Sequence, residues 1–523
     1  MKRAFWFDGE HMDEQIAAVD TTGTHAVHFA KNYNNKSVTE NGATGYRTTT
    51  KALLDLNFIV SSLRGRDEEY IVKEFIKAYH ESPMYAVKWL FFLRDILEGM
   101  GERRTFRVCL RYLAVSQPKI AQAVIKYVPE YGRYDDLYCV VGTPVEKDMF
   151  ALIKEQLEKD IASMNESEKA GVSLLAKWLK SENASSKETK MLGNKTRIAL
   201  GLTHKAYRET LSALRTRINI VEKLMSENKF NEIEYSKIPS KAGLIYRNAF
   251  AKRDAERYKE FINNKETKVN ACANYPYEMV REVSKHLNHY YWQEDYKWTE
   301  EERNALQKYW DNQKDYLQEK PCKIMGVIDT SGSMTNCRNG KVAPIDVAIS
   351  IGMYAAERVG GPFKDHFITF ASQPQLIKVE GIDFVDKVKR IYDKNLVDNT
   401  NLRAAFDLIK NIALQPGVNR DDVPNTLVVV SDMEIDCGSF WRDEHIRKTE
   451  MESIRDEWKS LGLPMPHLVY WNVDARNNLI LDSDEATYVS GCSPVIFESI
   501  LTGKSGWDLC YDKLMSERYR NVQ

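Results

Sequence analysis

The sequence predicts a multidomain protein in which an all-α helical-repeat domain, HEAT-like in character, precedes an α/β domain with a doubly wound, Rossmann-like sheet. Three observations predict this fold class. The chain has 523 residues, too many for a single hydrophobic core. Apolar residues recur at helical spacing from about residue 47 to residue 320. Beyond residue 321, short apolar runs typical of buried strands alternate with helical stretches.

The helical pattern rests on periodicity and on capping signals. One buried face is predicted at Ile71, Phe75, Ala78 and Tyr79. Ser82 and Pro83 then supply an N-cap and a first helical residue whose missing N–H costs nothing. Thr299 with Glu302 three residues later is a capping box. Short helices joined by short loops indicate stacked helical pairs over 47–320, preceded by a polar extension over 1–46.

The segment 321–523 reads as an α/β domain. Its strand-like runs are 324–328, 366–370, 426–430 and 467–471, with helical stretches at 345–359, 402–414 and 446–461. Strands that alternate with helices indicate a parallel sheet covered on both faces. Ligands bind such sheets at the carboxyl ends of the strands, so polar residues at these positions are candidate ligand-binding residues.

Oxygen-bearing side chains follow two of these strands. Asp329, Ser331 and Ser333 come directly after the first run, and Asp432 follows the third. Thr400 lies just before a predicted helix. Mg²⁺ prefers six oxygen ligands in octahedral array and gives up water reluctantly, which suits hydroxyls combined with carboxylates. The competing interpretation is a strand–turn–helix in which Asp and Ser only cap a helix.

The order of these residues resembles the metal-ion-dependent adhesion site of von Willebrand factor A (vWA) domains. The resemblance implies that Ser331, Ser333 and Thr400 bind the metal directly and that Asp329 and Asp432 hold its waters. The implied ion is Mg²⁺, or another divalent cation such as Mn²⁺ or Ca²⁺, with room for an acidic group from a protein partner. Two positions depart from the vWA pattern, because Asn399 and Met433 stand where Gly is common.

Nearly the whole chain, roughly residues 40–515, resembles an uncharacterised family, the DUF2828 group. The stretches that carry the resemblance are FLRDI (92–96), GERR (101–104), EYGRYDDL (130–137), LAKW (175–178), EKLM (222–225) and YSKIPSK (235–241). That family is in turn similar to the Ro/TROVE proteins, in which a ring of helical repeats carries a vWA domain. Ro-type proteins bind small structured RNAs, and the ends of misfolded RNAs, on a basic ring.

Charge is distributed unevenly along the chain. Residues 171–260 hold 19 Lys and Arg against 10 Asp and Glu, whereas residues 321–523 hold 23 against 29. A basic stretch in a near-neutral protein is a candidate polyanion-binding surface. The Ro resemblance implies RNA-binding side chains at Lys195, Arg197, Lys205, Arg208, Arg215, Arg217, Lys237, Lys241, Arg247, Lys252 and Arg253. The alternative is an ordinary solvated surface whose cations pair with neighbouring Glu residues.

Enzyme motifs and targeting signals are lacking. Gly503-Lys504-Ser505 is no P-loop, because Glu498 stands at the required upstream Gly. Ser331 sits in no Gly-x-Ser-x-Gly elbow, and we expect no enzymatic activity. The eight cysteines form no Cys-x-x-Cys pair, no apolar run reaches the roughly 18 residues of a membrane span, and no signal peptide is visible, so we expect a cytoplasmic protein.

Two functions fit these patterns. The first is a Ro-like, cytoplasmic RNA-binding protein, a ribonucleoprotein component with a vWA module that binds a partner through its metal. The alternative is a metal-dependent protein-interaction scaffold, or a phage or assembly structural component, without RNA binding. The basic segment favours the first function, and the metal residues are compatible with both.

Overall fold

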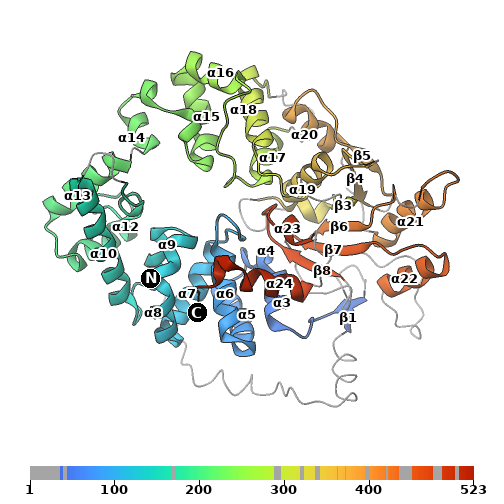
Figure 1. Cartoon of the computed structure of the whole chain (residues 1–523), viewed down its shortest axis with the longest axis horizontal. Coiled ribbons are helices and arrows are strands. Elements are labelled where there is room, and N and C mark those ends of the chain that lie inside the picture. The colour runs from blue at the N-terminus through green and yellow to red at the C-terminus, as the bar shows by residue number, and fades with distance from the viewer. Residues whose placement is uncertain are drawn as a thin grey trace.

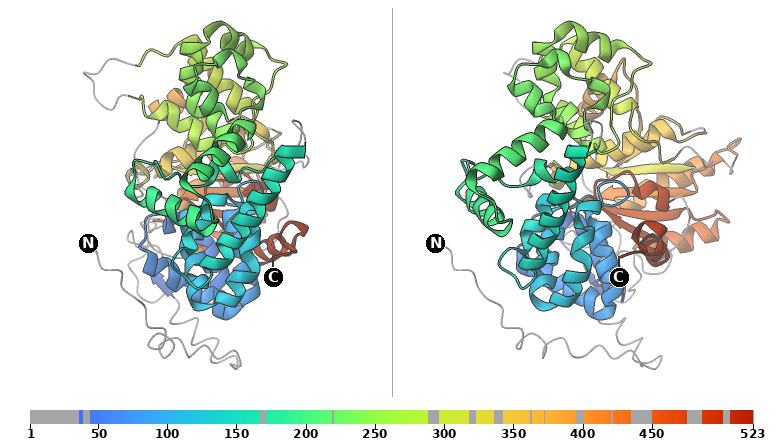
Figure 2. Two further views of the ribbon diagram at one scale, coloured as in Figure 1. Left: turned by 90° about the vertical axis from the view of Figure 1, so that its left-hand side faces the viewer. Right: turned by 60° about the vertical axis from the view of Figure 1, so that its left-hand side comes forward.

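The computed structural model describes residues 36–38, 44–166, 171–218, 220–287, 296–317, 323–335, 342–361, 363–371, 373–394, 401–419, 422–434, 450–474, 486–500 and 506–522. A helical region is followed by an α/β domain, as the sequence predicted (Figure 1). The helices follow one another in an arc, and the first of them lie beside the last strand. Figure 2 places the helices of residues 240–311 at one end of the molecule and the N-terminal helices at the other.

The first group of helices follows a small antiparallel pair, β1 (Lys36–Val38) and β2 (Thr44–Tyr46). Its members are α3 (Ala52–Phe58), α4 (Val60–Leu63), α5 (Glu68–Glu81), α6 (Pro83–Arg94), α7 (Arg104–Ser116), α8 (Pro118–Val124) and α9 (Val128–Tyr131). The predicted caps are present: the Ser82 hydroxyl accepts a hydrogen bond from the Tyr85 N–H at 3.5 Å, and Pro83 begins α6. These helices pack on their sequence neighbours, as expected of stacked helical pairs.

The second group continues the arc. Its members are α10 (Glu146–Glu166), α11 (Leu175–Trp178), α12 (Lys187–Ala199), α13 (His204–Ile218), α14 (Val221–Ser226), α15 (Ser240–Arg253), α16 (Ala255–Asn263), α17 (Pro276–Ser284) and α18 (Glu300–Asp311). The predicted capping box begins α18, because the Thr299 hydroxyl accepts from the Glu302 N–H and the Glu302 carboxylate accepts from the Thr299 N–H.

The α/β domain is built on six strands: β3 (Ile324–Asp329), β4 (His366–Phe370), β5 (Leu376–Lys378), β6 (Thr426–Ser431), β7 (His467–Asn472) and β8 (Thr487–Ser490). Their order is β5-β4-β3-β6-β7-β8, and β5 alone is antiparallel to its neighbour. In chain order of the strands this is 3-2-1-4-5-6, the doubly wound arrangement. The sequence predicted four of these strands and missed β5 and β8, which have three and four residues.

Helices cover both faces of the sheet. They are α19 (Pro344–Arg358), α20 (Phe384–Asp393), α21 (Leu402–Ala413), α22 (Glu450–Ser460), α23 (Ile496–Ile500) and α24 (Gly506–Met515). Alternate residues of β6 enter two different cores: Val428 and Val430 pack with α19, whereas Leu427 and Val429 pack with α21 and α22. This period of two explains why a strand buried on both faces reads as a continuous apolar run.

The helical region contacts the α/β domain at both of its ends. At one end α17 and α18 share a core with α19, in which Val280 and Trp310 are buried. At the other, α3 lies against β8, where Phe58 and Tyr488 meet edge to face at 5.0 Å. The C-terminal helix α24 returns onto α6, and Leu514 joins the core of the first helices. The chain therefore forms a closed circuit, and residues 506–522 belong to the helical core in packing although they follow the sheet.

Candidate functional site

The predicted acidic residues meet at the carboxyl edge of the sheet. Asp329 ends β3, and Ser431 ends the neighbouring parallel strand β6, with Asp432 next. The Asp329 side chain is fully buried. Its Oδ1 accepts a hydrogen bond from the Ser331 N–H at 2.8 Å, and its Oδ2 accepts from the Ser431 hydroxyl at 2.5 Å. Two neighbouring strands thereby fix the direction of the carboxylate.

The two predicted serine ligands lie together beside it. Ser331 and Ser333 are half-buried, and their Oγ atoms are 3.0 Å apart. The chain turns here into a short 3-10 helix, Gly332–Thr335, which brings both hydroxyls to one side of the loop. Thr400, the third predicted ligand, lies outside the described residues, next to Asn401, which caps α21.

The loop after β6 needs an unusual backbone. Met433 has φ +63°, in the left-handed region that favours glycine. This is one of the two positions at which the sequence departs from the vWA pattern, and a glycine would adopt this backbone conformation without strain. The turn is held by the Met433 N–H, which donates to the Ser431 hydroxyl at 3.0 Å, and by the Glu434 N–H, which donates to Asp432 Oδ1 at 3.3 Å.

Electrostatics make this edge a candidate cation site. Burial, and secondarily the charge of Asp432, raise the pKa of the Asp329 carboxyl to about 7. Two buried carboxylates in one place are unfavourable unless a cation neutralises them. Among the described residues no three His, Cys, Asp or Glu side chains gather as metal ligands, so a metal here depends on the serine hydroxyls. Two carboxylates with two hydroxyls are the oxygen donors that a hard divalent ion takes, and the residues therefore fit Mg²⁺.

Sequence reasoning missed the other half of the same sheet edge. Asn472 and Ser490 end β7 and β8, and both are buried against the turn between α3 and α4. The Ser61 N–H donates to Ser490 Oγ at 3.0 Å, and the Asn472 side-chain amide donates to the Phe58 carbonyl at 2.7 Å. The helical region thus covers the β7–β8 half of the edge and leaves the acidic site on the β3–β6 half. The polar residues Asn472 and Ser490 at the ends of β7 and β8 were the sequence signal that could have indicated this contact.

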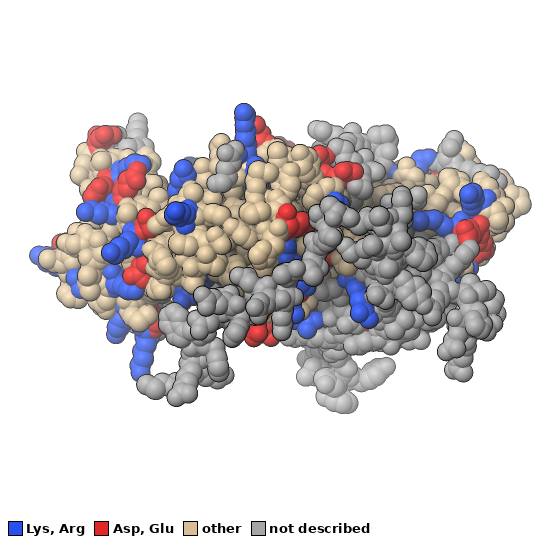
Figure 3. Space-filling model, turned by 90° about the horizontal axis from the view of Figure 1, so that it is seen from below, with Lys and Arg blue, Asp and Glu red and all other residues tan. Residues whose placement is uncertain are grey.

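The predicted basic side chains, apart from Arg247, are exposed or half-buried. Lys205, Arg208, Lys237, Lys241, Lys252 and Arg253 are exposed, and Lys195, Arg197, Arg215 and Arg217 are half-buried. Several pair with carboxylates: Lys195 with Glu146 at 2.6 Å, Arg197 with Glu182 at 2.7 Å, Lys237 with Glu234 at 2.6 Å and Lys241 with Glu278 at 2.7 Å. Figure 3 shows Lys and Arg gathered at its left, toward the α10–α13 end, with acidic side chains among them.

Arg247 does not lie on this surface, and its prediction as an RNA-binding residue is wrong. Arg247 is buried, with 7 % of its surface exposed to solvent. The guanidinium pairs with Glu282 and donates to the Leu244 carbonyl at 2.6 Å. Helix spacing places Arg247 on the packed face of α15. The sequence alone does not indicate that Glu282 on α17 is its ion-pair partner.

Comparisons with known proteins agree with the motifs. Residues 122–321 match the domain of unknown function DUF2828, and residues 323–517 match the domain of unknown function DUF7788. The DUF2828 match lies within the helical region and covers a shorter range than the motifs suggested.

The proteins similar to the chain include a viral protein and a solved bacterial structure. An uncharacterized protein of Acanthamoeba polyphaga mimivirus is 28% identical over 519 residues, which cover 90% of this chain and 85% of that protein. The crystal structure of the Ro (RSR) protein of Deinococcus radiodurans is similar with a TM-score of 0.42 and 13% identity, over 85% of this chain and 93% of that one. No described helix combines the length and apolar character needed to cross a bilayer.

Proposed function

We propose that this chain is a Ro-like RNA-binding protein that holds small structured or misfolded RNA on the basic surface of its helical domain. The observation that carries the proposal is the set of exposed cations on α13 and α15. Among the described residues, Arg208, Lys252 and Arg253 are exposed and form no ion pair with a carboxylate. Cations without protein counter-ions are free to neutralise phosphates, which supplies most of the affinity for a polyanion. We assign no catalytic step to the chain.

The decisive experiment asks whether the chain binds RNA through these cations. Protein purified without nuclease should carry nucleic acid, seen in the ratio of absorbance at 260 and 280 nm and identified by sequencing. Fluorescence anisotropy should then give a dissociation constant for that RNA that weakens steeply as salt rises.

The double variant Lys252→Ala/Arg253→Ala should lower the slope of log K against log salt by about 0.7–0.9 for each lost phosphate contact. Lys364→Ala removes an exposed cation from the acidic α/β domain and should leave the slope unchanged. No binding of any RNA at low salt would overturn the proposal and favour the scaffold alternative.

We further propose that the carboxyl edge of β3 and β6 binds Mg²⁺, or another divalent cation, for attachment of a protein partner. Support comes from the buried Asp329 and Asp432 carboxylates and the adjacent Ser331 and Ser333 hydroxyls. The serines would bind the ion directly and the carboxylates through water. An ion neutralised in this way retains a position for a carboxylate of the partner. Pull-down of partners with and without EDTA tests this role, and capture that survives both EDTA and Asp329→Ala would contradict it.

A further inference from the structure

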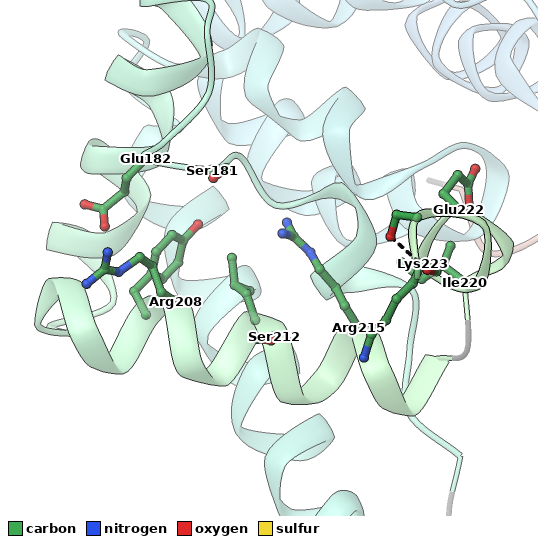
Figure 4. A pocket seen from close by; sticks show the side chains of 11 residues that line it. Ser181, Glu182, Arg208, Ser212, Arg215, Ile220, Glu222 and Lys223 are labelled. Atoms are coloured by element: carbon green, nitrogen blue, oxygen red, sulfur yellow. Dashed lines mark hydrogen bonds between the residues drawn. The ribbon is translucent and has the colours of Figure 1, made fainter. Parts of the chain in front are cut away.

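A pocket opens between the segment that follows α11 and the helices α13 and α14. Its volume is about 410 Å³, within the roughly 300–1,000 Å³ of small-molecule sites. Figure 4 shows Glu182 and Arg208 at one end, Ser212 and Arg215 in the middle, and Glu222 and Lys223 at the other end. The lining is therefore rich in charge of both signs.

One face of α13 forms the floor of the pocket. Arg208, Leu211, Ser212 and Arg215 line it, and their spacing of three, four and seven residues puts them on one side of a helix. Seven residues at 1.5 Å each separate the two arginines by roughly 10 Å along the helix axis. Ser212 lies between them, and its hydroxyl forms no hydrogen bond to the described residues.

Arg215 is a half-buried cation without an acidic partner. Its Nε and Nη2 donate to the Ala176 and Leu179 carbonyls at 2.8 and 3.0 Å, at the end of α11. Burial lowers the pKa of this guanidinium, yet an arginine side chain keeps its charge in proteins. No carboxylate among the described residues pairs with it. The remaining amino group, Nη1, is left for an anion in the pocket.

Glu182 adds an unmet hydrogen-bond acceptor. The residue is 7 % exposed. Its Oε1 accepts from Arg197 Nε at 2.7 Å and lies 3.0 Å from His204 Nδ1. Its Oε2 is buried and has no hydrogen-bond partner among the described residues. A buried acceptor without a donor costs roughly 1–3 kcal/mol, so a ligand hydroxyl that donates here would recover that cost.

We propose that this pocket binds one ribonucleotide unit, with the phosphate on Arg215 and Ser212 and the ribose 2′-hydroxyl donating to Glu182. An oxyanion alone satisfies Arg215 but not Glu182, and a phosphate joined to a hydroxylated sugar satisfies both. In an RNA chain the 2′-hydroxyl is the only free sugar donor, and it distinguishes RNA from DNA. Arg208 lies at the Glu182 end, where it neutralises the next phosphate of the chain. The inference rests on the proposed RNA-binding function and names one of its contact sites.

Titration calorimetry of the full chain with AMP, 2′-deoxy-AMP and inorganic phosphate tests the pocket. AMP should bind about tenfold or more tightly than 2′-deoxy-AMP, because a hydrogen bond to a charged group is lost. Inorganic phosphate should bind more weakly still. The variant Glu182→Gln should reduce the ratio between AMP and 2′-deoxy-AMP.

A second variant fills the pocket and leaves the Arg215 and Glu182 side chains in place. Ser212 is exposed on α13, so Ser212→Phe should fold normally, shown by an unchanged Tm, and lose AMP binding at least tenfold. Lys364→Ala, at an exposed position in the α/β domain and outside the pocket, should leave AMP binding unchanged. Full AMP affinity in Ser212→Phe, or equal affinity for the two nucleotides, would overturn the inference.

The two proposals fail in different ways. If the RNA binds but AMP does not, and Ser212→Phe binds RNA as the wild type does, the pocket assignment is overturned while the RNA-binding function stands. If AMP binds but no RNA does, the RNA-binding function is overturned. The pocket would then bind a free nucleotide and would not be a contact site for RNA.

Discussion

Asp329 illustrates how a single buried carboxylate depends on its surroundings. The side chain is fully buried, accepts two hydrogen bonds from Ser331 and Ser431, and lies within reach of the charge of Asp432. The sequence predicted which residues meet, because parallel strands end at one edge of the sheet. It did not predict the depth of burial, which depends on tertiary packing around the edge.

Removal of this carboxylate should abolish metal binding. In wild-type protein, Mg²⁺ at about 100 times its Kd should stabilise the fold by about 2.7 kcal/mol. We expect no stabilisation in Asp329→Asn, which keeps the side-chain size and loses the charge. Thermal unfolding with Mg²⁺ and with EDTA measures the difference. Asp365→Asn, half-buried in the same domain, is the control that should keep the full response.

The site should respond to pH near neutrality. The pKa of Asp329 is raised from 3.8 to about 7 by burial and then by Asp432. Between these values the folded metal-free protein holds a proton that the unfolded chain has released, so its unfolding free energy falls as pH rises through this window. A metal binds the ionised form, and Mg²⁺ affinity should therefore rise from pH ~6 to pH ~8. Urea titrations at several pH values, with EDTA or Mg²⁺, measure both trends, and a flat Mg²⁺ affinity would contradict them.

At the scale of elements, the C-terminal segment is held to α6 by one ionic cluster. Arg518 Nε donates to Asp95 Oδ2 at 2.8 Å, and the Tyr519 hydroxyl donates to the same oxygen at 2.9 Å. Asp95 is completely buried at the end of α6. Arg518 also lies over the Tyr131 ring at 4.7 Å, so one side chain joins three elements that are distant in sequence.

Loss of Arg518 should be costly because it leaves a buried acid with fewer partners. We expect Arg518→Ala to lower the unfolding free energy by about 3 kcal/mol, the size found when one member of a buried pair is removed. Arg520→Ala is the matched control: its side chain is 71% exposed and pairs with an exposed Glu517, and it should cost at most about 0.5 kcal/mol. Equal effects of the two substitutions in urea titrations would show that the cluster is not structural.

At the scale of the whole molecule, the two predicted domains do not have separate cores. Helices α17 and α18 share apolar residues with α19, and α24 packs with the first helices. Phe58 and Ser61 fix the first helices to β8, and the Tyr275 hydroxyl donates to the Met100 carbonyl at 3.1 Å across the arc. The molecule is therefore expected to unfold as one unit.

Division of the chain should expose these shared surfaces. A fragment of residues 1–320 lacks Cys510, Leu514 and Tyr519, which are buried in its core. We expect the fragment to bind a hydrophobic dye and to unfold well below the full chain, which should melt in a single calorimetric transition. Two transitions in the full chain, or a fragment as stable as the whole, would contradict this.

The sequence by itself determined the fold class, most of the strands, the helix caps and the polar residues that meet at the carboxyl edge of β3 and β6, because these depend on local periodicity and on signals a few residues apart. Only the tertiary structure decided which cations are exposed, since Arg247 meets Glu282 and Arg215 meets the carbonyls of α11 through contacts distant in sequence. The pocket beside α13 and the closed circuit of the chain also arise from such contacts. Local patterns carry no information about which surfaces meet, and burial decides whether a charge binds a partner or packs within the fold.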